Sequence, residues 1–251
     1  MSASSNAVVS PSANPASRRA AHASNSSPRA TAGFVLEAEL WSAGYRAIAG
    51  VDEVGRGPWA GPVVAAAVIL PPDPVALAPL LGQVDDSKRL TPSQRERLFG
   101  PIQQLALATG VGCVAADAID RVGIAAATRQ AMRQALMVLG VQPDFVLLDY
   151  LTLPDLSLPQ RGVPHGDALS FSIAAASIVA KVSRDRWMAE QAAIYPGYGF
   201  ARHKGYGTME HHAALVRLGP CALHRLSFAP VAVLRASSNQ EAGFQAGSNA
   251  N

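Results

Sequence analysis

The stretch AIAGVDEVGRG, residues 47–57, places two adjacent acids at the end of a short apolar strand. Asp52 and Glu53 are poor strand formers, and acids are rarely buried without a partner. Adjacent strand residues point to opposite faces, so a purely structural role would have to satisfy each carboxylate separately. The pattern therefore favours a bound cation at the end of this strand, and a divalent metal ion fits best.

Apolar strands and helices alternate around this stretch. Strands are predicted over 47–51, 62–70, 111–115 and 145–148, with helices near Pro92, from Ile124 and over 171–193. Such alternation is typical of an α/β fold, in which helices cover a sheet.

Local signals predict where two of these helices begin and end. Thr91 and Gln94 fit a capping box around Pro92, and Gly100-Pro101 is expected to shorten or kink this helix. The helix from Ile124 carries apolar residues at spacings of three and four. It is expected to stop at a C-terminal glycine cap, Gly140.

The composition predicts one globular domain with polar tails. The chain has 251 residues, 49% of them hydrophobic, which is enough for one core. It lacks an uncharged apolar run of about 20 residues, which argues against a membrane span. Cys113 and Cys221 are far apart and have no Cys-x-x-Cys partner, so neither a disulfide framework nor a zinc site is expected, and a reducing, cytoplasmic compartment fits.

The two ends of the chain differ in composition from the rest. Residues 1–32 are rich in Ser, Ala, Asn and Pro, and 236–251 are similar, so both are predicted to be disordered tails around a domain at 33–235. The first tail is also faintly similar to an organelle transit peptide. It holds three arginines and no acid, which accounts for the net charge of +3. The rest of the chain has equal numbers of basic and acidic residues.

Two further acids follow apolar segments. Asp149 follows the strand at 145–148, and Asp167 follows Gly166 just before the long helix. Two carboxylates about 4 Å apart repel by about 4 kcal/mol, and divalent ions would reverse the sign of that interaction. Oxygen ligands favour Mg²⁺ or Mn²⁺. Singly, Asp149 could be a turn residue and Asp167 a helix cap, while Asp185 is expected to pair with a neighbouring arginine outside the metal set.

The loop after the paired acids suits close contact with a sugar or phosphate. Gly55 and Gly57 let the main chain approach a ligand, and Arg56 supplies a charged fork, although a tight turn is the plainer interpretation. The glycines do not match the dinucleotide fingerprint, and no Gly-Lys-Ser/Thr loop occurs, so no small-molecule nucleotide cofactor is expected.

Basic and aromatic residues gather toward the C-terminus. Between Lys181 and Arg225 the chain has seven Lys or Arg against three acids, a face that could meet phosphates. Asp86-Ser87-Lys88 and the segment 203–208 combine the groups needed to grip phosphates and stack on bases. Tyr195 and Tyr198 could contact nucleic acid or only pack, and His211 and His212 are interpreted first as solvated surface groups.

The run over 49–70 closely resembles ribonuclease HII. Further landmarks occur in the family's order: Asp86-Ser87-Lys88, Leu148-Asp149, Gly166-Asp167, the segment from Ala175 to Asp185, His203-Lys204-Gly205-Tyr206 and His224-Arg225-Leu226-Ser227-Phe228. The resemblance implies a ribonuclease H-like mixed sheet flanked by helices, with a helical C-terminal part. It also implies an endonuclease that cuts RNA–DNA hybrids, and duplex DNA 5′ to single embedded ribonucleotides, during replication and ribonucleotide excision repair. The sequence leaves the oligomeric state open, and a monomer is the default expectation.

The resemblance carries over residue by residue. It implies that four acids bind two Mg²⁺ or Mn²⁺ ions when substrate is present and act in catalysis: Asp52, Glu53, Asp149 and Asp167. It implies a second, substrate-binding set, in which the glycine-arginine-glycine loop reads the ribose 2′-hydroxyl and the tyrosine stacks beside the junction with the following deoxynucleotide. The set is Gly55, Arg56, Gly57, Lys88, Lys181 and Tyr206.

The sequence departs from the family's pattern at two positions. Gly123 stands where asparagine is common, and Tyr150 stands where glycine is common. Two alternatives fit the sequence less well than this family. Ribonuclease HIII carries an ordered N-terminal domain that residues 1–32 are too short and polar to supply, and a binding protein without cleavage activity would have lost at least one acid.

Overall fold

The computed structural model describes residue 1 and residues 33–80, 83–84 and 90–235. Three of the sequence predictions lie outside these described residues: the tail at 1–32 apart from residue 1, the tail at 236–251, and Lys88 with its neighbours Asp86 and Ser87.

One mixed sheet forms the centre of the molecule. Its strands are β1 (Ile48–Val54), β2 (Val63–Ile69), β3 (Ala108–Val114), β4 (Phe145–Asp149) and β5 (Gln160–Val163), in the order β3-β2-β1-β4-β5. β2 runs antiparallel to β1 and β3, whereas β4 and β5 run parallel to β1. The central strand is therefore the one that ends in the paired acids.

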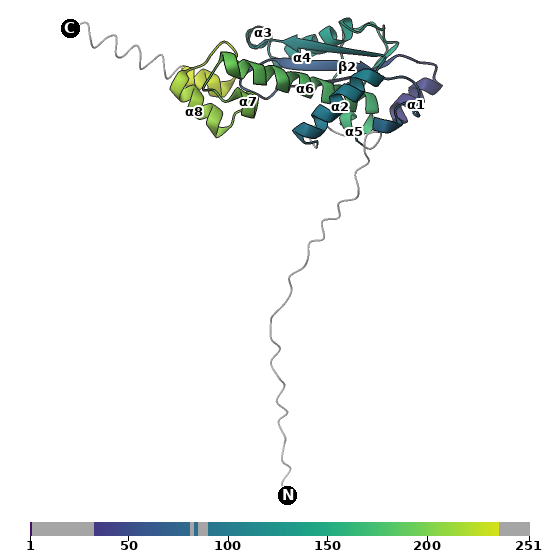
Figure 1. The fold of residues 1–251 in the computed structure, drawn as a ribbon, viewed down its shortest axis with the longest axis horizontal. Helices are drawn as coiled ribbons and strands as arrows, with labels where there is room; N and C mark the ends of the chain where they lie inside the picture. Colours follow the sequence, from purple (N-terminus) through teal and green to yellow (C-terminus); the bar gives the residue numbers. More distant parts are fainter. Residues whose placement is uncertain (2–32, 81–82, 85–89, 236–251) are drawn as a thin grey trace, which may run out of the picture.

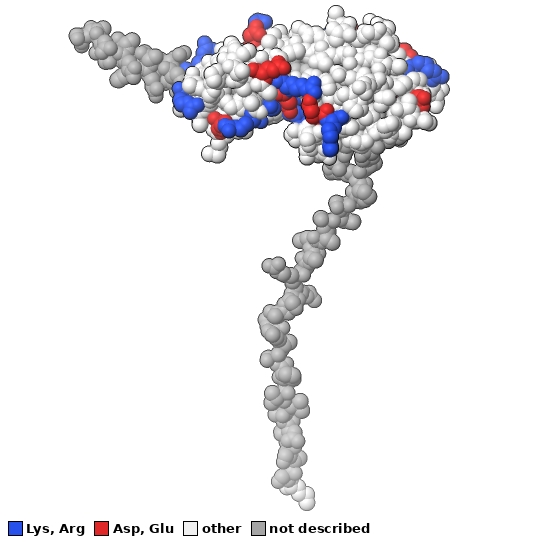
Figure 2. Space-filling view, in the orientation of Figure 1, with Lys and Arg blue, Asp and Glu red and all other residues white. Residues whose placement is uncertain are grey.

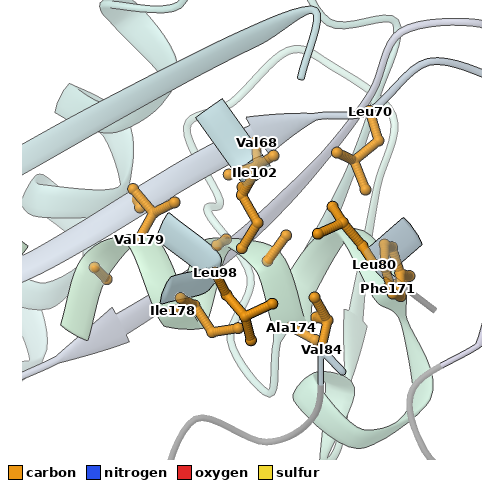
Figure 3. Close-up of a cluster of buried hydrophobic side chains, with 14 of the residues drawn as sticks. Val68, Leu70, Leu80, Val84, Leu98, Ile102, Phe171, Ala174, Ile178 and Val179 are labelled. Carbon is orange, nitrogen blue, oxygen red and sulfur yellow. The ribbon is translucent and has the colours of Figure 1, made fainter. Parts of the chain in front are cut away.

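Helices cover both faces of the sheet, as the alternating pattern predicts. Ala66 and Val68 of β2 pack against α6 (Phe171–Ile194) and α2 (Pro92–Leu105). Ala65 and Ala67, which alternate with them, pack on the other face against α4 (Ile124–Met137). Figure 1 shows α6 and α2 on one side of the strands and α4 on the other. Figure 3 shows the first of these cores, where Leu98 and Ile102 of α2 meet Ile178 of α6.

The long helix α6 touches the central strand through a glycine. A Cβ atom added at Gly50 would lie 2.2 Å from the carbonyl carbon of Ser172 and 2.4 Å from the nitrogen of Ile173. No side chain fits between these two backbones, so the start of α6 packs directly on β1 two residues before Asp52.

The C-terminal part is helical. After α6 come α7 (Phe200–His203), α8 (Met209–Leu218) and a helical segment at 229–235. In Figure 1, α7 and α8 lie at one end of the molecule, and α1 (Val35–Ser42) lies at the other. The short helices α3 (Ala116–Val122) and α5 (Gly166–Leu169) and the 3-10 turn η1 (Ala78–Leu80) complete the described elements.

The capping box of α2 is confirmed. The Thr91 hydroxyl accepts from the backbone N–H of Gln94, and the Gln94 side chain accepts from the N–H of Thr91. Of the two effects predicted at Gly100-Pro101, the shortening is wrong, because α2 continues to Leu105, and the kink stays a prediction. Ile102, directly after the proline, is fully buried in the core, and this packing compensates for the one backbone hydrogen bond that proline cannot donate.

The predicted stop of α4 at Gly140 is also wrong. The helix ends at Met137, and the N–H of Leu139 bonds to the carbonyl of Leu136, so the last turn tightens before the glycine. The glycine with a positive φ lies at the other end, where Gly123 at +78° joins α3 to α4. No helix in the described part of the chain is long and apolar enough to cross a membrane.

Candidate active site

Three carboxylates meet at the end of the central strands. Val51 of β1 pairs with Leu148 of the parallel strand β4, so Asp52 and Asp149, the next residues, lie side by side. Asp167 joins them from α5, whose first residue donates its N–H to Asp149 Oδ1 over 2.8 Å. One oxygen from each of the three acids lies within 4.8 Å of the others. The predicted convergence of these three side chains is confirmed.

Asp52 is the most electrostatically perturbed of the three. It is buried on the α6 face, opposite Ala66 of β2. Burial raises the pKa of Asp52 well above its ordinary value, and the charges of Glu53 and Asp149 raise it further. A hydrogen bond with the Ser177 side chain opposes this rise. A divalent cation beside these carboxylates would favour their charged forms.

Glu53 stands apart from the group of three. It pairs with Ala65 of β2, a residue of the α4 face, so its side chain starts on the opposite side of the sheet from Asp52. Glu53 Oε1 lies 3.4 Å from an Arg56 guanidinium nitrogen. Both acids nevertheless line one pocket of about 220 Å³ at the strand end.

This pocket combines the acids with most of the predicted substrate-binding set. Its lining includes Asp52, Glu53, Asp149, Gly55, Arg56, Gly57, Ser177, Lys181 and Tyr206. The residues come from β1, the loop after it, β4, α6 and the segment after α7, so distant parts of the sequence meet here. A concave site that holds several acids beside basic and aromatic groups suits a charged ligand with a ring system.

The glycine loop has a backbone that requires glycine at its start. Gly55 has φ +89°, and a Cβ atom there would lie 2.4 Å from Arg184 Nε and 2.7 Å from the Pro62 carbonyl oxygen. At Gly57 an added Cβ would meet nothing within 4 Å. The loop is thus packed tightly at Gly55 and open at Gly57.

Lys181 and Asp185 form an ion pair on α6 beside the pocket. Lys181 Nζ lies 2.8 Å from Asp185 Oδ1, so the predicted pairing of Asp185 with a neighbouring arginine is wrong. Residues four apart share a helix face, whereas adjacent residues do not. Burial lowers the pKa of Lys181, and Asp185 opposes this shift. Figure 2 shows side chains of both charges on the face where α6 and α2 lie.

Tyr206 carries the aromatic ring of the pocket. Its ring centroid lies 5.8 Å from Lys181 Nζ and 5.9 Å from the Arg184 guanidinium carbon, within reach of cation–π attraction. The side chain is 40% exposed, so one part of the ring stays open to a ligand. Tyr198, by contrast, is buried, stacks on Phe200 and donates its hydroxyl to the Gly219 carbonyl, which makes it a packing residue.

Several buried polar residues escaped the sequence analysis. Arg184 and Arg225 are fully buried, although both stand in segments that carry the family resemblance. His211 is buried as well, so its interpretation as a solvated group is wrong, whereas His212 is exposed as expected. Desolvation lowers the pKa of His211 to about 4. The only sequence signal for the two arginines was their place inside the landmark segments, and His211 lies outside those segments.

The donor atoms suit a hard divalent cation. The three clustered acids offer oxygen atoms alone, which Mg²⁺ and Mn²⁺ prefer, and two of the three are buried where mutual repulsion is strong. Glu53, at the same strand end, could supply a fourth carboxylate.

Comparison with protein families gives a match over most of the chain. The family model described as Ribonuclease HII matches residues 49–231. A protein named Ribonuclease HII from Dehalococcoides mccartyi is 54% identical over 203 residues, which covers 79% of this chain and 93% of the relative. The Ribonuclease HII of Geobacillus thermodenitrificans is 57% identical over 195 residues, 78% of this chain and 73% of the relative.

Solved structures have the same fold. The ribonuclease H2 from Pyrococcus horikoshii superposes with a TM-score of 0.63 at 25% identity, covering 76% of this chain and 97% of the other. Bst-RNase HIII, solved in complex with Mn²⁺, superposes with a TM-score of 0.61 at 19% identity, covering 78% of this chain and 71% of the other. The architecture is therefore ribonuclease H-like.

Proposed function

The chain belongs to the ribonuclease HII family, and we propose that it cleaves duplex DNA on the 5′ side of single embedded ribonucleotides. Membership makes it a ribonuclease H, an endonuclease of the hydrolase class that acts on RNA–DNA hybrids. The proposed products are a 3′-hydroxyl and a 5′-phosphate, and the proposed cellular task is removal of ribonucleotides from DNA.

We assign the chemistry to four acids, Asp52, Glu53, Asp149 and Asp167. The observation that carries this assignment is the convergence of three of them within 4.8 Å beside the pocket. Two Mg²⁺ or Mn²⁺ ions bound there would supply Lewis acidity for water attack and for stabilisation of the leaving oxygen. Buried carboxylates hold such ions rigidly, and the parallel pairing of β1 and β4 fixes their spacing.

Substrate recognition is assigned to groups beside the acids. The loop of Gly55, Arg56 and Gly57 would contact the ribose 2′-hydroxyl, which distinguishes RNA from DNA at one nucleotide. Lys181 would neutralise a phosphate, and Tyr206 would stack beside the following deoxynucleotide. Lys88 is proposed as a further phosphate contact, although it lies outside the described residues.

The assignment of Asp149 can be tested with a charge-neutral variant. Asp149→Asn keeps the size of the side chain and removes the charge that would hold the metal. Cleavage of a duplex with one ribonucleotide in Mg²⁺ is expected to fall at least about 100-fold, which corresponds to about 3 kcal/mol of transition-state stabilisation. The measurement is a single-turnover rate on an end-labelled strand.

The matched control is Asp155→Asn. Asp155 is 82% exposed, forms an ion pair with Arg133 and lies outside the pocket, so its variant should cleave at the wild-type rate. An Asp149→Asn protein that cleaves normally would remove Asp149 from the mechanism.

We also propose the extent, oligomeric state, location and partners of the catalytic unit. The catalytic unit is proposed to be the domain at 33–235, acting as a monomer in the cytoplasm, and the proposed partners are RNA–DNA hybrids and ribonucleotide-containing DNA. The family match over 49–231 supports the extent of this domain. A gel-filtration mass near 26.1 kDa would support the monomer.

A further inference from the structure

A buried arginine holds the loop that borders the acids. Arg225 is fully buried and donates to the carbonyl oxygen of Gly55 over 2.6 Å and to that of Arg56 over 2.9 Å. It also donates twice to the carbonyl oxygen of Gly61, over 2.8 and 3.0 Å. One guanidinium thus fixes three carbonyls of the same loop.

A second buried arginine ties the far end of this loop to the tyrosine segment. Arg184 donates to the carbonyl oxygens of Ala60, over 3.1 Å, and Pro62, over 2.9 Å. Its remaining bond goes to the Lys204 carbonyl over 3.0 Å, two residues before Tyr206. The loop and the tyrosine therefore share one rigid support.

The bonds of Arg225 determine where the neighbouring amides point. The described part of the chain contains no cis peptide, and in a planar trans peptide the C=O and N–H groups point in opposite directions. Since the carbonyls of Gly55 and Arg56 point inward at Arg225, the N–H groups of Arg56 and Gly57 point away from it. Gly55 is buried, whereas Arg56 and Gly57 are exposed and line the pocket.

Arg225 keeps its charge in this position. Burial, and after it the nearby Arg184 guanidinium, lowers the pKa of Arg225 to about 9, so the side chain remains protonated at neutral pH. Hydrogen bonds from an ionised donor are stronger than neutral ones. Asp120 holds the adjacent turn by accepting the backbone N–H groups of Leu226 and Ser227 over 2.8 and 2.9 Å.

We propose that Arg225 is a positioning residue for recognition of the 2′-hydroxyl. By fixing two carbonyls inward, it aims the amides of Arg56 and Gly57 at one oxygen of a bound ribose. This inference rests on the proposed function, because it assumes that the loop reads a ribonucleotide. A lysine keeps the charge but lacks the planar fork that reaches several carbonyls, so Arg225→Lys should loosen the two amides.

The test compares binding of two duplexes that differ by one hydroxyl. One holds a single ribonucleotide, and the other is entirely DNA; both are titrated in EDTA so that no cleavage occurs. Wild-type protein should bind the first more tightly, and Arg225→Lys should reduce this preference by about tenfold, the effect of losing one or two hydrogen bonds. The Kd for the all-DNA duplex should stay unchanged, since phosphate contacts carry it.

The matched control is Arg217→Lys, at an arginine that donates to one carbonyl, Gly197, outside the pocket. It should keep the wild-type preference. A folded Arg225→Lys protein that also keeps this preference overturns the proposal, as does an equal loss of affinity for both duplexes, which would indicate a merely structural role.

A measurement on the wild-type protein covers the case in which Arg225→Lys does not fold. The backbone amide resonances of Arg56 and Gly57 should shift with the ribonucleotide duplex and stay in place with the all-DNA duplex. Identical responses to both, or a cleaving enzyme that binds both equally, contradict the inference alone. A wild-type protein that neither cleaves nor discriminates contradicts the proposed function itself.

Discussion

The catalytic role proposed for Asp52 comes at a cost to the stability of the folded protein. It is buried between two other acids, and burial with the charges of Glu53 and Asp149 raises its pKa well above the ordinary value. In the absence of a cation, the folded protein bears the free energy of keeping these charges close together. Such destabilised groups are expected at sites selected for chemistry.

The variant Asp52→Asn should therefore lose cleavage and gain stability. The neutral amide removes a buried charge, so the free energy of unfolding in EDTA at pH 7.5 should rise by about 1–2 kcal/mol. Urea unfolding measures the change, and Asp155→Asn, at an exposed acid, should leave stability within about 0.5 kcal/mol. A less stable Asp52→Asn protein would contradict the account of repulsion among these acids.

Among the single residues of the site, the acids were predictable from the sequence, whereas the buried arginines were not. Asp52 and Asp149 could be found because each ends an apolar strand, which places their side chains at one edge of the sheet. Arg225 bonds to carbonyls about 170 positions earlier in the chain, and no local pattern encodes such a partner. The wrong partner for Asp185 was avoidable, since Lys181 stands four residues before it on the same helix.

Among the elements, the contact of α6 with β1 depends on one glycine. An alanine Cβ at Gly50 would overlap the backbone of Ser172 at 2.2 Å, and backbone atoms cannot move aside without displacing the helix. Gly50→Ala should destabilise the protein by about 3 kcal/mol or more, measured by urea unfolding.

Gly100 in α2 is the matched control for Gly50. An added Cβ there meets nothing within 4 Å, and alanine favours the helix, so Gly100→Ala should stabilise by about 0.5–1 kcal/mol. A neutral Gly50→Ala would show that α6 does not pack on β1 as closely as described.

Two neutral histidines, His211 and His224, form a hydrogen-bonded chain from the Tyr206 carbonyl to the backbone of Cys221. The Tyr206 carbonyl accepts from His211 Nδ1 over 2.9 Å, so His211 Nε2 accepts from His224 Nε2 over 3.0 Å. His224 Nδ1 in turn accepts the N–H of Cys221 over 2.9 Å. Protonation of His211 would place two donors against each other and break this chain.

The stability of the protein should fall in acid because of these histidines. Desolvation, before other causes, lowers the pKa of His211 and of His224 to about 4, whereas an unfolded histidine titrates near 6.5. The contribution of each neutral histidine to the free energy of unfolding is complete above pH 6.5 and is lost as the pH falls toward 4. At pH 5 the loss is about 2 kcal/mol for each histidine.

Variants of neighbouring histidines isolate this effect. The stability difference between wild type and His211→Asn should shrink as the pH is lowered from 7.5 to 5, as measured by urea unfolding. The exposed neighbour serves as the control, and His212→Gln should track the wild type at each pH. A difference for His211→Asn that does not change with pH would contradict the neutral chain.

Elements with strong local signals were predictable. The strands ending at the acids, the capping box of α2 and the long α6 were all expected from periodicity and capping. The edge strand β5, with the sequence QRGV, is short and polar, so it has no apolar signature of its own and is defined by pairing with β4. The end of α4 was misplaced because a tightened last turn, which composition does not encode, precedes Gly140.

In the whole molecule, the pocket forms where the sheet meets the C-terminal helices. The acids come from strand ends, whereas Lys181 and Tyr206 come from α6 and the segment beyond α7. Arg184 and Arg225 join these two parts through backbone carbonyls. The pocket proposed for chemistry and recognition thus depends on contacts between distant parts of the chain, which the order of the landmarks alone does not show.

The proposed function requires cleavage at the four acids to occur beside a single ribonucleotide that the adjacent loop reads. Its most direct test is to map the cut in a duplex with one embedded ribonucleotide, labelled at each end in turn, with Mg²⁺ or Mn²⁺. We expect one cut on the 5′ side of the ribonucleotide, with a 3′-hydroxyl and a 5′-phosphate at the new ends. An intact duplex under conditions in which a continuous RNA–DNA hybrid is cleaved, or a cut at any other position, would contradict it.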